Sequence, residues 1–333
     1  MTPPYRPRRT CLAVPGSSER FLAKARGLAV DEVFLDLEDA VAPAAKPEAR
    51  RAVAAALNAG GWGSKTRAVR INDVTTPWAY RDVIEVVEAA GASLDVIVLP
   101  KVAAPDHVRW LDLLLGQVEQ ATGLDLGRIG IEAQIEEASG LAQVDRIAAA
   151  SGRLEALVFG PADFMASIGM RSLQVGAEPD GYTGGDAYHY PRMRILVAAR
   201  SRGLAAIDGP HLAIHDLDGL RRGAASAAAL GYDGKWVLHP AQVDVVNQAF
   251  SPDQDSYDRA EQILDAYAEA TETAHRGAVM LGDEMIDEAS RKLAMVTAAK
   301  GRAAGLARGG AAGPGSAEHP PAGQRLGQPA GQG

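Results

Sequence analysis

The sequence predicts an α/β protein, a (β/α)8 TIM barrel with a C-terminal helical extension. Eight short apolar runs recur along the 333 residues, and each is followed by a turn signal and a helix-like segment. The runs are too apolar to face water on one side, and strands of this kind alternating with helices are typical of a parallel sheet. Eight repeats favour closure into a barrel. Neither GxGxxG nor GxxxxGK(S/T) follows the first run, so a nucleotide-binding open sheet is the weaker alternative.

The predicted strands follow one another in regular order, at residues 10–16, 32–39, 66–72, 95–101, 129–136, 154–160, 204–210 and 234–240. Amphipathic stretches rich in Ala, Leu, Arg and Glu separate them, and those at 47–60 and 106–123 have the spacing of helices. The connection after the sixth strand is too long for an ordinary loop, because it includes the glycine-rich and aromatic segment 171–190. We expect this segment to cover the substrate site, with simple surface decoration as the alternative.

Three divisions of the chain are predicted: a barrel domain at 1–250, a helical extension at 251–302 and a disordered tail at 303–333. The extension contains an amphipathic helix at 256–276, a hairpin-like link at 277–287 and a last helix at 288–302. Closing a barrel does not require these elements, so we interpret them as an interface element or a lid. The tail is rich in Gly, Ala and Pro without apolar periodicity, which predicts disorder.

Composition excludes several classes of function. A net charge of −8 and a pI near 5.4 argue against nucleic acid as a partner. The single cysteine, Cys11, rules out an intrachain disulfide framework and fits the reducing cytoplasm. No apolar run approaches the roughly 20 residues of a membrane span. The first ten residues, MTPPYRPRRT, are basic but lack the apolar core of a secretory signal, so we expect a disordered lead-in.

Polar residues gather where the predicted strands end, which is where TIM barrels carry their chemistry. They are Pro15-Gly16-Ser17, Asp36, Glu38, Asp39, Arg70, Asn72, Lys101, Glu136, Asp163, Asp208 and His239. Any one of the acids could instead cap the following helix, and for Asp208 this alternative is as good as a functional role. For His239 we prefer a structural imidazole to a general base.

Glu136 and Asp163 form a candidate metal site. They end two consecutive apolar runs and are 27 residues apart, about the length of one strand-helix-strand unit. In adjacent parallel strands both carboxylates reach the same end of the sheet. Mg²⁺ binds through one or two carboxylates together with substrate and water oxygens, so the pair suits this ion. The alternative is that each acid stabilises the helix that follows.

These residues also lie in motifs that resemble a known family. The motifs are PGS (15–17), FLDLEDAVAP (34–43) with Lys46, VRIN (69–72), PKV (100–102), IE (135–136), GPADF (160–164), IDGP (207–210), GKWVLHP (234–240) and MID (285–287). In this order, from about residue 10 to 302, they resemble the citrate lyase β-subunit and HpcH/HpaI aldolase superfamily of CoA-ester lyases. The segments GWGSKTRAVRIN, TPWAYRDV, ASIGM and GKWVLHPAQV are most similar to malyl-CoA and β-methylmalyl-CoA lyases.

The resemblance implies a Mg²⁺-dependent, reversible Claisen-type cleavage of a 3-carboxy-3-hydroxyacyl-CoA into an acyl-CoA and a 2-oxoacid, with Mn²⁺ as a possible substitute. For malyl-CoA the products would be acetyl-CoA and glyoxylate; β-methylmalyl-CoA would yield propionyl-CoA. It also implies a homo-oligomer, either a trimer or a hexamer. The implied roles are metal ligation by Glu136 and Asp163, substrate contacts by Arg70, Glu136, Gly160, Pro161 and Ala162, support of the metal by Glu38 and Asp39 directly or through water, and acid or base catalysis by Asp287.

The charges that develop in this reaction can be stabilised by the residue types present. Breaking the C–C bond leaves an enolate, and a fixed Arg70 guanidinium can face the developing charge without deprotonating. We expect Asp287 to act from a neighbouring subunit, although it could simply cap the last helix.

Three other functions are compatible with the same motifs. A malyl-CoA thioesterase, a citramalyl-CoA lyase or a non-catalytic citrate lyase β-type subunit would carry similar motifs. Lys101 could form a Schiff base, as lysines do in other aldolase barrels, but the predicted metal pair makes this the weaker interpretation.

Overall fold

The first compact unit of the protein is a closed parallel barrel. The computed structural model describes residues 6–176, 179–272 and 277–309 and divides the chain between Pro252 and Asp253. The strands are β1 (Thr10–Pro15), β2 (Glu32–Asp36), β3 (Thr66–Arg70), β4 (Val96–Leu99), β5 (Gly130–Ile135), β6 (Leu154–Phe159), β7 (Ala205–Asp208) and β8 (Gly234–Val237). Each pairs in parallel with the next, and β8 closes on β1 through Cys11 opposite Trp236. The predicted TIM barrel is therefore confirmed.

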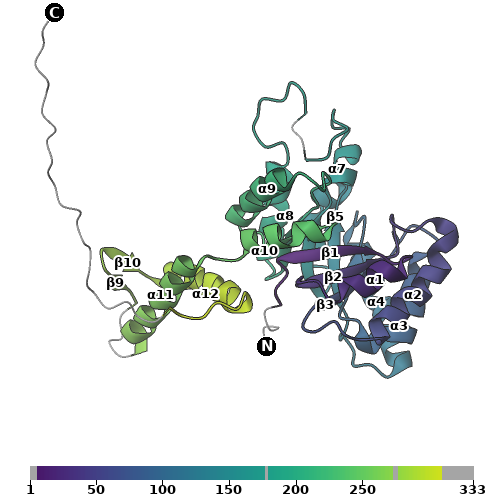
Figure 1. Cartoon of the computed structure of the whole chain (residues 1–333), viewed down its shortest axis with the longest axis horizontal. Coiled ribbons are helices and arrows are strands. Elements are labelled where there is room, and N and C mark those ends of the chain that lie inside the picture. Colours follow the sequence, from purple (N-terminus) through teal and green to yellow (C-terminus); the bar gives the residue numbers. More distant parts are fainter. Residues whose placement is uncertain (1–5, 177–178, 273–276, 310–333) are drawn as a thin grey trace, which may run out of the picture. The chain divides into compact units, whose positions relative to one another are not determined.

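Helices connect the strands and surround the barrel (Figure 1). They are α1 (Glu19–Ala25), α2 (Lys46–Asn58), α3 (Ala79–Ala90), α4 (Pro105–Thr122), α5 (Ala138–Ala142), α6 (Val144–Ala148), α7 (Pro161–Ser167), α8 (His189–Arg200), α9 (Leu217–Leu230) and α10 (Val243–Phe250), with single 3-10 turns at Pro43–Ala45, Gly91–Ser93 and Pro240–Gln242. The predicted helix at 106–123 corresponds to α4, which starts with Pro105 and is capped at its C-terminal end by Gly123. Gly123 has a φ of 70°, a left-handed conformation that suits glycine at a helix end.

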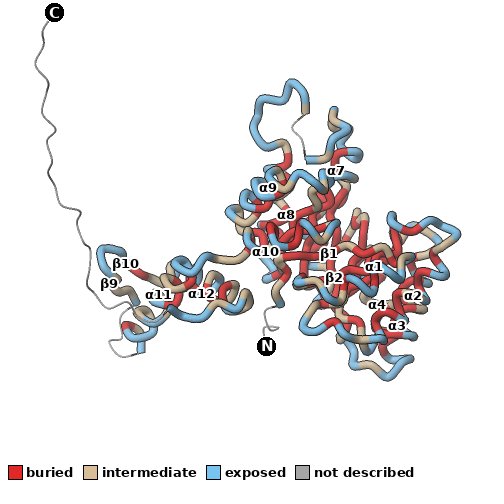
Figure 2. Tube along the Cα trace, in the orientation of Figure 1, coloured by how far each residue is buried: buried red, intermediate tan, exposed pale blue. Residues whose placement is uncertain are grey.

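The core has two layers. Inside the barrel a small cluster includes Cys11, Phe34, Val98 and Trp236. A much larger cluster fills the space between the strands and the inward faces of the helices. In Figure 2 buried residues lie along the strands, and exposed residues are common in the loops. Strands buried on both faces read as continuous apolar runs, which is why all eight could be predicted.

The N-terminal end of the barrel is closed by residues predicted to be disordered. Arg8 is only 4% exposed, and its guanidinium binds Glu32 (3.2 Å), Glu132 (2.7 Å) and Glu155 (2.5 Å). Arg9 binds Asp31 with two nitrogens, each at 2.8 Å. The predicted lead-in is thus wrong for Arg8 and Arg9, because carboxylates far along the chain pair with these arginines. Residues 1–5 lie outside the described residues.

The second unit contains α11 (Gln254–Glu272), an antiparallel hairpin of β9 (Val279–Leu281) and β10 (Glu284–Ile286), and α12 (Glu288–Ala303). The hairpin and last helix match the prediction; residues 273–276 of the predicted first helix lie outside the described residues. Tyr257, Ala260, Ala294 and Ala298 form a core between α11 and α12. No helix in the described ranges is long and apolar enough to cross a membrane.

The predicted tail is ordered at its start. Arg308 binds Glu261 at 2.5 Å and Asp265 at 2.7 Å, so the chain after α12 folds back along α11. The prediction of disorder is therefore wrong for this part, because Arg308 forms ion pairs with Glu261 and Asp265 on α11. The remainder of the predicted tail, residues 310–333, lies outside the described residues.

Candidate active site

A cavity of about 410 Å³ lies at the carboxyl end of the barrel strands. Its wall is polar where several strands end and apolar elsewhere. Seven residues of this wall carry polar or charged side-chain groups, and they come from five strands or the segments after them. They are Asp36, Asp39, Arg70, Gln134, Glu136, Asp163 and Trp236. Gly160, Pro161 and Ala162 also line it. The structure thus brings together most of the residues that the sequence predicted for the site.

Arg70, at the end of β3, is fixed on three sides. Its Nε and Nη2 each donate to Asp36 at 2.7 Å, and its Nη1 lies 2.9 Å from Glu38. The guanidinium also lies over the Trp236 ring, 5.4 Å from the centroid. The bonds to Asp36 occupy two of the five N–H donors of an arginine, and the contact with Glu38 is an ion pair. The remaining donors can face a substrate oxygen in the cavity.

Charge pairing keeps Arg70 and Asp36 ionised. Burial by itself raises the pKa of Asp36, but the Arg70 guanidinium and the N–H groups of Glu38 and Ala40 outweigh burial and lower it below its ordinary value. Burial likewise lowers the pKa of Arg70, yet Asp36 and Glu38 raise it overall. The site therefore holds a permanent, rigid positive charge.

Glu136 directly follows β5 and is 1% exposed. Its Oε1 accepts the Lys101 backbone N–H at 2.8 Å, and its Oε2 accepts the side-chain amide of Gln134. Gly160 leaves the necessary space, because a Cβ at that position would lie 2.3 Å from Oε2 of Glu136. The carboxylate is therefore held in one orientation by its neighbours.

Burial, followed by repulsion from Glu38 and Asp163, raises the pKa of Glu136 to about 8. Asp163 lies in the first turn of α7 and is half-buried in the same cavity. The predicted pair is thus close enough for the two carboxylates to repel each other. A divalent cation between them would relieve this repulsion, so the donor set fits Mg²⁺.

The site is not a preformed metal cage. Within the described residues, no three His, Cys, Asp or Glu side chains are grouped so that they could hold a metal ion. Mg²⁺ commonly takes one or two carboxylates and fills its other positions with water and substrate oxygens. A pair of acids facing an open cavity is consistent with this mode of binding.

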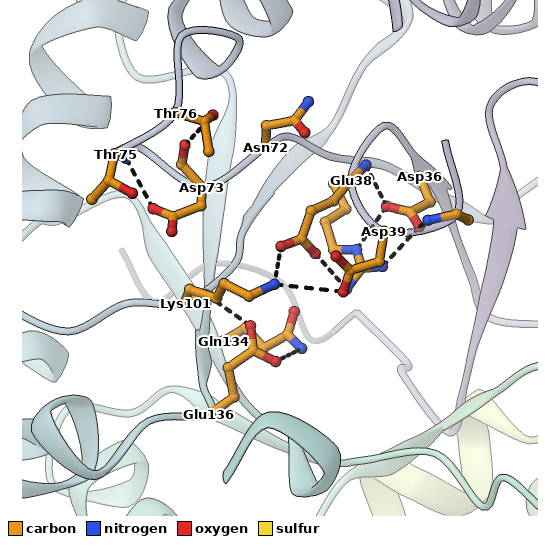
Figure 3. A network of polar contacts seen from close by, with 12 residues as sticks. Asp36, Glu38, Asp39, Asn72, Asp73, Thr75, Thr76, Lys101, Gln134 and Glu136 are labelled. Carbon is orange, nitrogen blue, oxygen red and sulfur yellow. Dashed lines mark hydrogen bonds and ion pairs between the residues drawn. The ribbon is translucent and has the colours of Figure 1, made fainter. Parts of the chain in front are cut away.

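Glu38 and Asp39 belong to a network that reaches Lys101 (Figure 3). The Lys101 ammonium binds Glu38 and lies 3.5 Å from Asp39. Burial raises the pKa of Glu38, although Arg70 and Lys101 oppose this effect. Burial lowers the pKa of Lys101, but Glu38, Glu136 and Asp39 raise it overall. A Schiff base requires a neutral amine, so the network disfavours the imine role considered for Lys101.

Three further candidates from the sequence have structural partners elsewhere. Asp208 binds Lys235 at 2.5 Å and Arg192 at 3.2 Å, so it is an ion-paired residue rather than a helix cap. The His239 Nδ1 accepts the Ala241 N–H at 3.2 Å, which agrees with a structural imidazole. Asp287 belongs to the second unit, where its carboxylate caps α12 by accepting the N–H groups of residues 289 and 290.

Asp208 and Lys235 line a neighbouring cavity of about 670 Å³. It is larger than the candidate site, and four of the charged residues in its wall, Asp186, Arg192, Asp208 and Lys235, are paired with one another. Leu173 to Gly176, from the long segment after the sixth strand, line this second cavity. The prediction that this segment covers the substrate site therefore stays a prediction: part of the segment borders this cavity, which shares Pro161, Pro210 and Leu212 with the candidate site. Residues 177–178 lie outside the described part.

The sequence assigns no role to three residues of the site. Asp36 is one of the polar strand ends, but no motif gives it a role. Gln134 precedes Glu136 by two positions, so strand alternation places both on one face and could have identified it. Trp236 lies inside an apolar motif and gave no comparable signal. Its indole N–H is buried and has no hydrogen-bond partner among the described residues.

The sequence and the fold are similar to those of known proteins. The family model described as HpcH/HpaI aldolase/citrate lyase matches residues 9–240. An L-malyl-CoA/β-methylmalyl-CoA lyase of Cereibacter sphaeroides is 39% identical over 302 residues, covering 88% of this chain and 94% of that protein. A (3S)-malyl-CoA thioesterase of the same organism is 33% identical over 297 residues, covering 89% and 95%.

A solved structure extends the similarity to three dimensions. The CitE protein of Mycobacterium tuberculosis, in complex with magnesium, acetoacetate and coenzyme A, matches with a TM-score of 0.67 and 30% identity, covering 88% of this chain and 97% of that chain. Because the family model spans more than half of the sequence and the barrel agrees with it, the chain belongs to the HpcH/HpaI aldolase/citrate lyase family.

Proposed function

We propose that this enzyme is a Mg²⁺-dependent carbon–carbon lyase that reversibly cleaves malyl-CoA to acetyl-CoA and glyoxylate, and β-methylmalyl-CoA to propionyl-CoA and glyoxylate. The observation that carries this proposal is the meeting of fixed Arg70 with the acidic pair Glu136 and Asp163 in one cavity. The similarity to an L-malyl-CoA/β-methylmalyl-CoA lyase supports the choice of substrate.

Glu136 and Asp163 are the proposed metal ligands. Mg²⁺, when bound there, would supply positive charge beside the hydroxyl and carboxylate oxygens of the substrate. Gly160 keeps the position of Glu136 accessible, and with Pro161 and Ala162 it forms the wall against which the small 2-oxoacid half would rest. Replacing Asp163 by Ala should abolish lyase activity and leave the barrel folded. Full activity of metal-stripped Asp163→Ala protein would contradict the assignment.

Arg70 is the proposed partner of the thioester oxygen. In cleavage, the hydroxyl loses its proton, the bond between the carbinol carbon and the acyl α-carbon breaks, and the electron pair of that bond enters the acyl group as an enolate. The free N–H groups of Arg70 would face the enolate oxygen as charge develops there. Asp36 and Glu38 prevent the guanidinium from moving away, so little reorganisation is needed during the reaction.

Asp287 is the proposed acid and base at the acyl α-carbon, acting from a neighbouring subunit of a homo-oligomer. Its pKa is lowered by the Ser290 N–H at the start of α12. Burial of an acid would raise its pKa, whereas the lowered pKa of Asp287 keeps the carboxyl group ionised. An ionised carboxylate is ready to take the methyl proton in the condensation direction. In cleavage the hydroxyl proton leaves to water, and Asp287, protonated from water, delivers the proton that the enolate carbon takes up.

The products of one assay test this proposal against its alternatives. Purified protein is incubated with malyl-CoA and Mg²⁺, or Mn²⁺ in a parallel reaction, and the products are separated. Glyoxylate with acetyl-CoA identifies a lyase, whereas malate with free CoA identifies a thioesterase, the alternative suggested by the relative that is 33% identical. In a separate reaction with citramalyl-CoA as the substrate, release of pyruvate would favour a citramalyl-CoA lyase. A lack of turnover would favour a subunit that requires partner chains.

A further inference from the structure

Lys101 has a backbone conformation that lysine rarely adopts. Its φ is 49°, and it is the one non-glycine residue with a positive φ in the part of the chain that the structure describes. A side chain in this left-handed region is sterically disfavoured, and such residues persist only where their surroundings hold them. We therefore expect contacts in the surrounding structure to hold Lys101 in this conformation.

The next residue supplies the restraint. The Val102 N–H donates to the Gln134 carbonyl at 3.1 Å, and the Val102 side chain is fully buried. The Val102 carbonyl lies against Gly140, where a Cβ would approach it to 2.2 Å. The loop after β4 is therefore docked on β5 and on the start of α5. The resulting turn directs the Lys101 N–H to Glu136.

The side chain of Lys101 extends toward a different strand. Its ammonium binds Glu38 and approaches Asp39, both of which follow β2, while its backbone holds Glu136 at the end of β5 (Figure 3). One residue thus connects the acid proposed as a metal ligand to two acids that are not. Lys101 therefore contacts three acids beside the cavity.

This arrangement matters because Mg²⁺ prefers six oxygen ligands in octahedral geometry. Every extra carboxylate that reaches the ion takes a position from the substrate and reduces the positive charge available to it. Glu38 is buried, and its carboxylate is held between the Arg70 guanidinium and the Lys101 ammonium. Removal of that ammonium would leave the carboxylate with its Arg70 contact but freer to turn toward the ion.

We propose that Lys101 is a positioning residue that holds Glu38 and Asp39 away from the metal, so that Glu136 and Asp163 alone bind it and the substrate takes the remaining positions. This inference rests on the proposed function. It predicts an unusual combination: removing the ammonium should strengthen Mg²⁺ binding and weaken catalysis. A lysine that merely supported the loop would weaken both.

The test compares Lys101→Met, which keeps the aliphatic stem, with Lys101→Gly, which also accommodates the positive φ. Mg²⁺ alone is titrated into metal-free protein by calorimetry, and kcat and KM are measured with malyl-CoA. We expect both variants to bind Mg²⁺ about 3- to 10-fold more tightly and to lose at least about 10-fold in kcat, with KM within about threefold of wild type. Lys101→Arg should retain most of the kcat, because it keeps a cation at this position.

A double variant and a control sharpen the test. Glu38→Gln combined with Lys101→Met should return the Mg²⁺ affinity toward the wild-type value, since the carboxylate that was released is then absent. Lys65→Met serves as the matched control, because the Lys65 ammonium binds the Arg26 carbonyl at 3.0 Å just before β3, away from the carboxyl ends of the strands. It should change neither the Mg²⁺ affinity nor kcat.

The outcomes separate this inference from the function on which it rests. Wild-type protein without Mg²⁺-dependent cleavage would refute the proposed function itself. Active wild type together with unchanged or weaker Mg²⁺ binding in both Lys101→Met and Lys101→Gly would overturn the positioning role alone. Thermal unfolding of Lys101→Gly shows whether the fold persists, because relief of the strained φ should maintain its Tm at or above that of Lys101→Met.

Discussion

Arg70 illustrates how the chemistry of a single residue depends on its fixed neighbours. Arginine can donate several hydrogen bonds from one rigid plane, and here Asp36 and Glu38 use one part of that plane while Trp236 covers a face. The residue type could be read from the motif VRIN, but the bidentate partner could not. Asp36 is 34 positions away in sequence and meets Arg70 only because β2 and β3 are adjacent, with Asp36 opposite Arg70 in register.

Replacing Arg70 by Lys should therefore be a severe change. Lysine keeps the charge but cannot bind both oxygens of Asp36 and still face an enolate oxygen. We expect kcat to fall by at least about 100-fold, more than any rise in KM, as observed on removing an oxyanion donor. Arg67→Lys is the control, because Arg67 pairs with Asp95 at the opposite end of β3. A near-normal kcat in Arg70→Lys would show that the guanidinium only supports the barrel.

Glu136 should destabilise the metal-free protein as pH rises. Its pKa is about 8 in the folded chain against an ordinary value of 4.5, so the fold favours the protonated form. Below pH 4.5 Glu136 is protonated in both the folded and the unfolded chain, so it costs no stability. As the pH rises toward 8 the loss of folding free energy grows by about 1.4 kcal/mol per pH unit and reaches roughly 3 kcal/mol at pH 7. Glu136→Gln, which cannot ionise, should therefore gain stability over wild type between pH 5 and pH 8.

Urea unfolding of both proteins in the presence of a chelator measures this difference. Other groups titrate in both chains, so only the pH dependence of the difference matters. Saturating Mg²⁺ should narrow the gap at pH 8, because it binds the wild-type site and stabilises it. A stability difference that stays constant from pH 5 to pH 8 would show that Glu136 is not strained by ionisation.

At the scale of elements, the strands were predictable and the loop conformations were not. The run 95–101 contains β4 (Val96–Leu99), because a strand buried on both faces must be apolar throughout. Lys101, two residues beyond this strand, has a left-handed conformation with no local sequence signal, since the contacts that impose it come from Gln134 and Gly140. Arg8 is a similar case: its partner Glu132 is 124 positions away, and no local pattern in a basic N-terminus predicts that ion pair.

The junction between β6 and α7 offers a test at this scale. Gly160 has room for no side chain, because a Cβ would lie 2.3 Å from the Glu136 Oε2 and 2.5 Å from its Cβ. Gly160→Ala should therefore displace Glu136 and lower kcat/KM by at least about 100-fold, while calorimetry shows weaker Mg²⁺ binding. Gly152→Ala is the matched control, since nothing lies within 4 Å of its added Cβ. Normal Mg²⁺ affinity in Gly160→Ala would refute the displacement.

At the scale of the whole molecule, the second unit has more apolar surface than its own core uses. Leu293 and Val296 on α12 are 73% and 55% exposed, and Met280 and Met285 of the hairpin are also exposed. Exposed large apolar side chains such as these can form a protein interface. We infer that these residues contact another copy of the chain, which is how Asp287 could reach a site built by a different barrel.

Subunit mixing tests this inference directly. Glu136→Gln lacks a metal ligand, and Asp287→Asn lacks the acid but keeps a side chain that can cap α12. Each variant alone should be inactive. After dissociation and reassembly of an equal mixture, about one site in four would combine an intact Glu136 from one chain with an intact Asp287 from its neighbour, so activity should return. If differently tagged chains demonstrably exchange and activity stays absent, Asp287 does not act across the interface, and the acid and the metal pair belong to one chain.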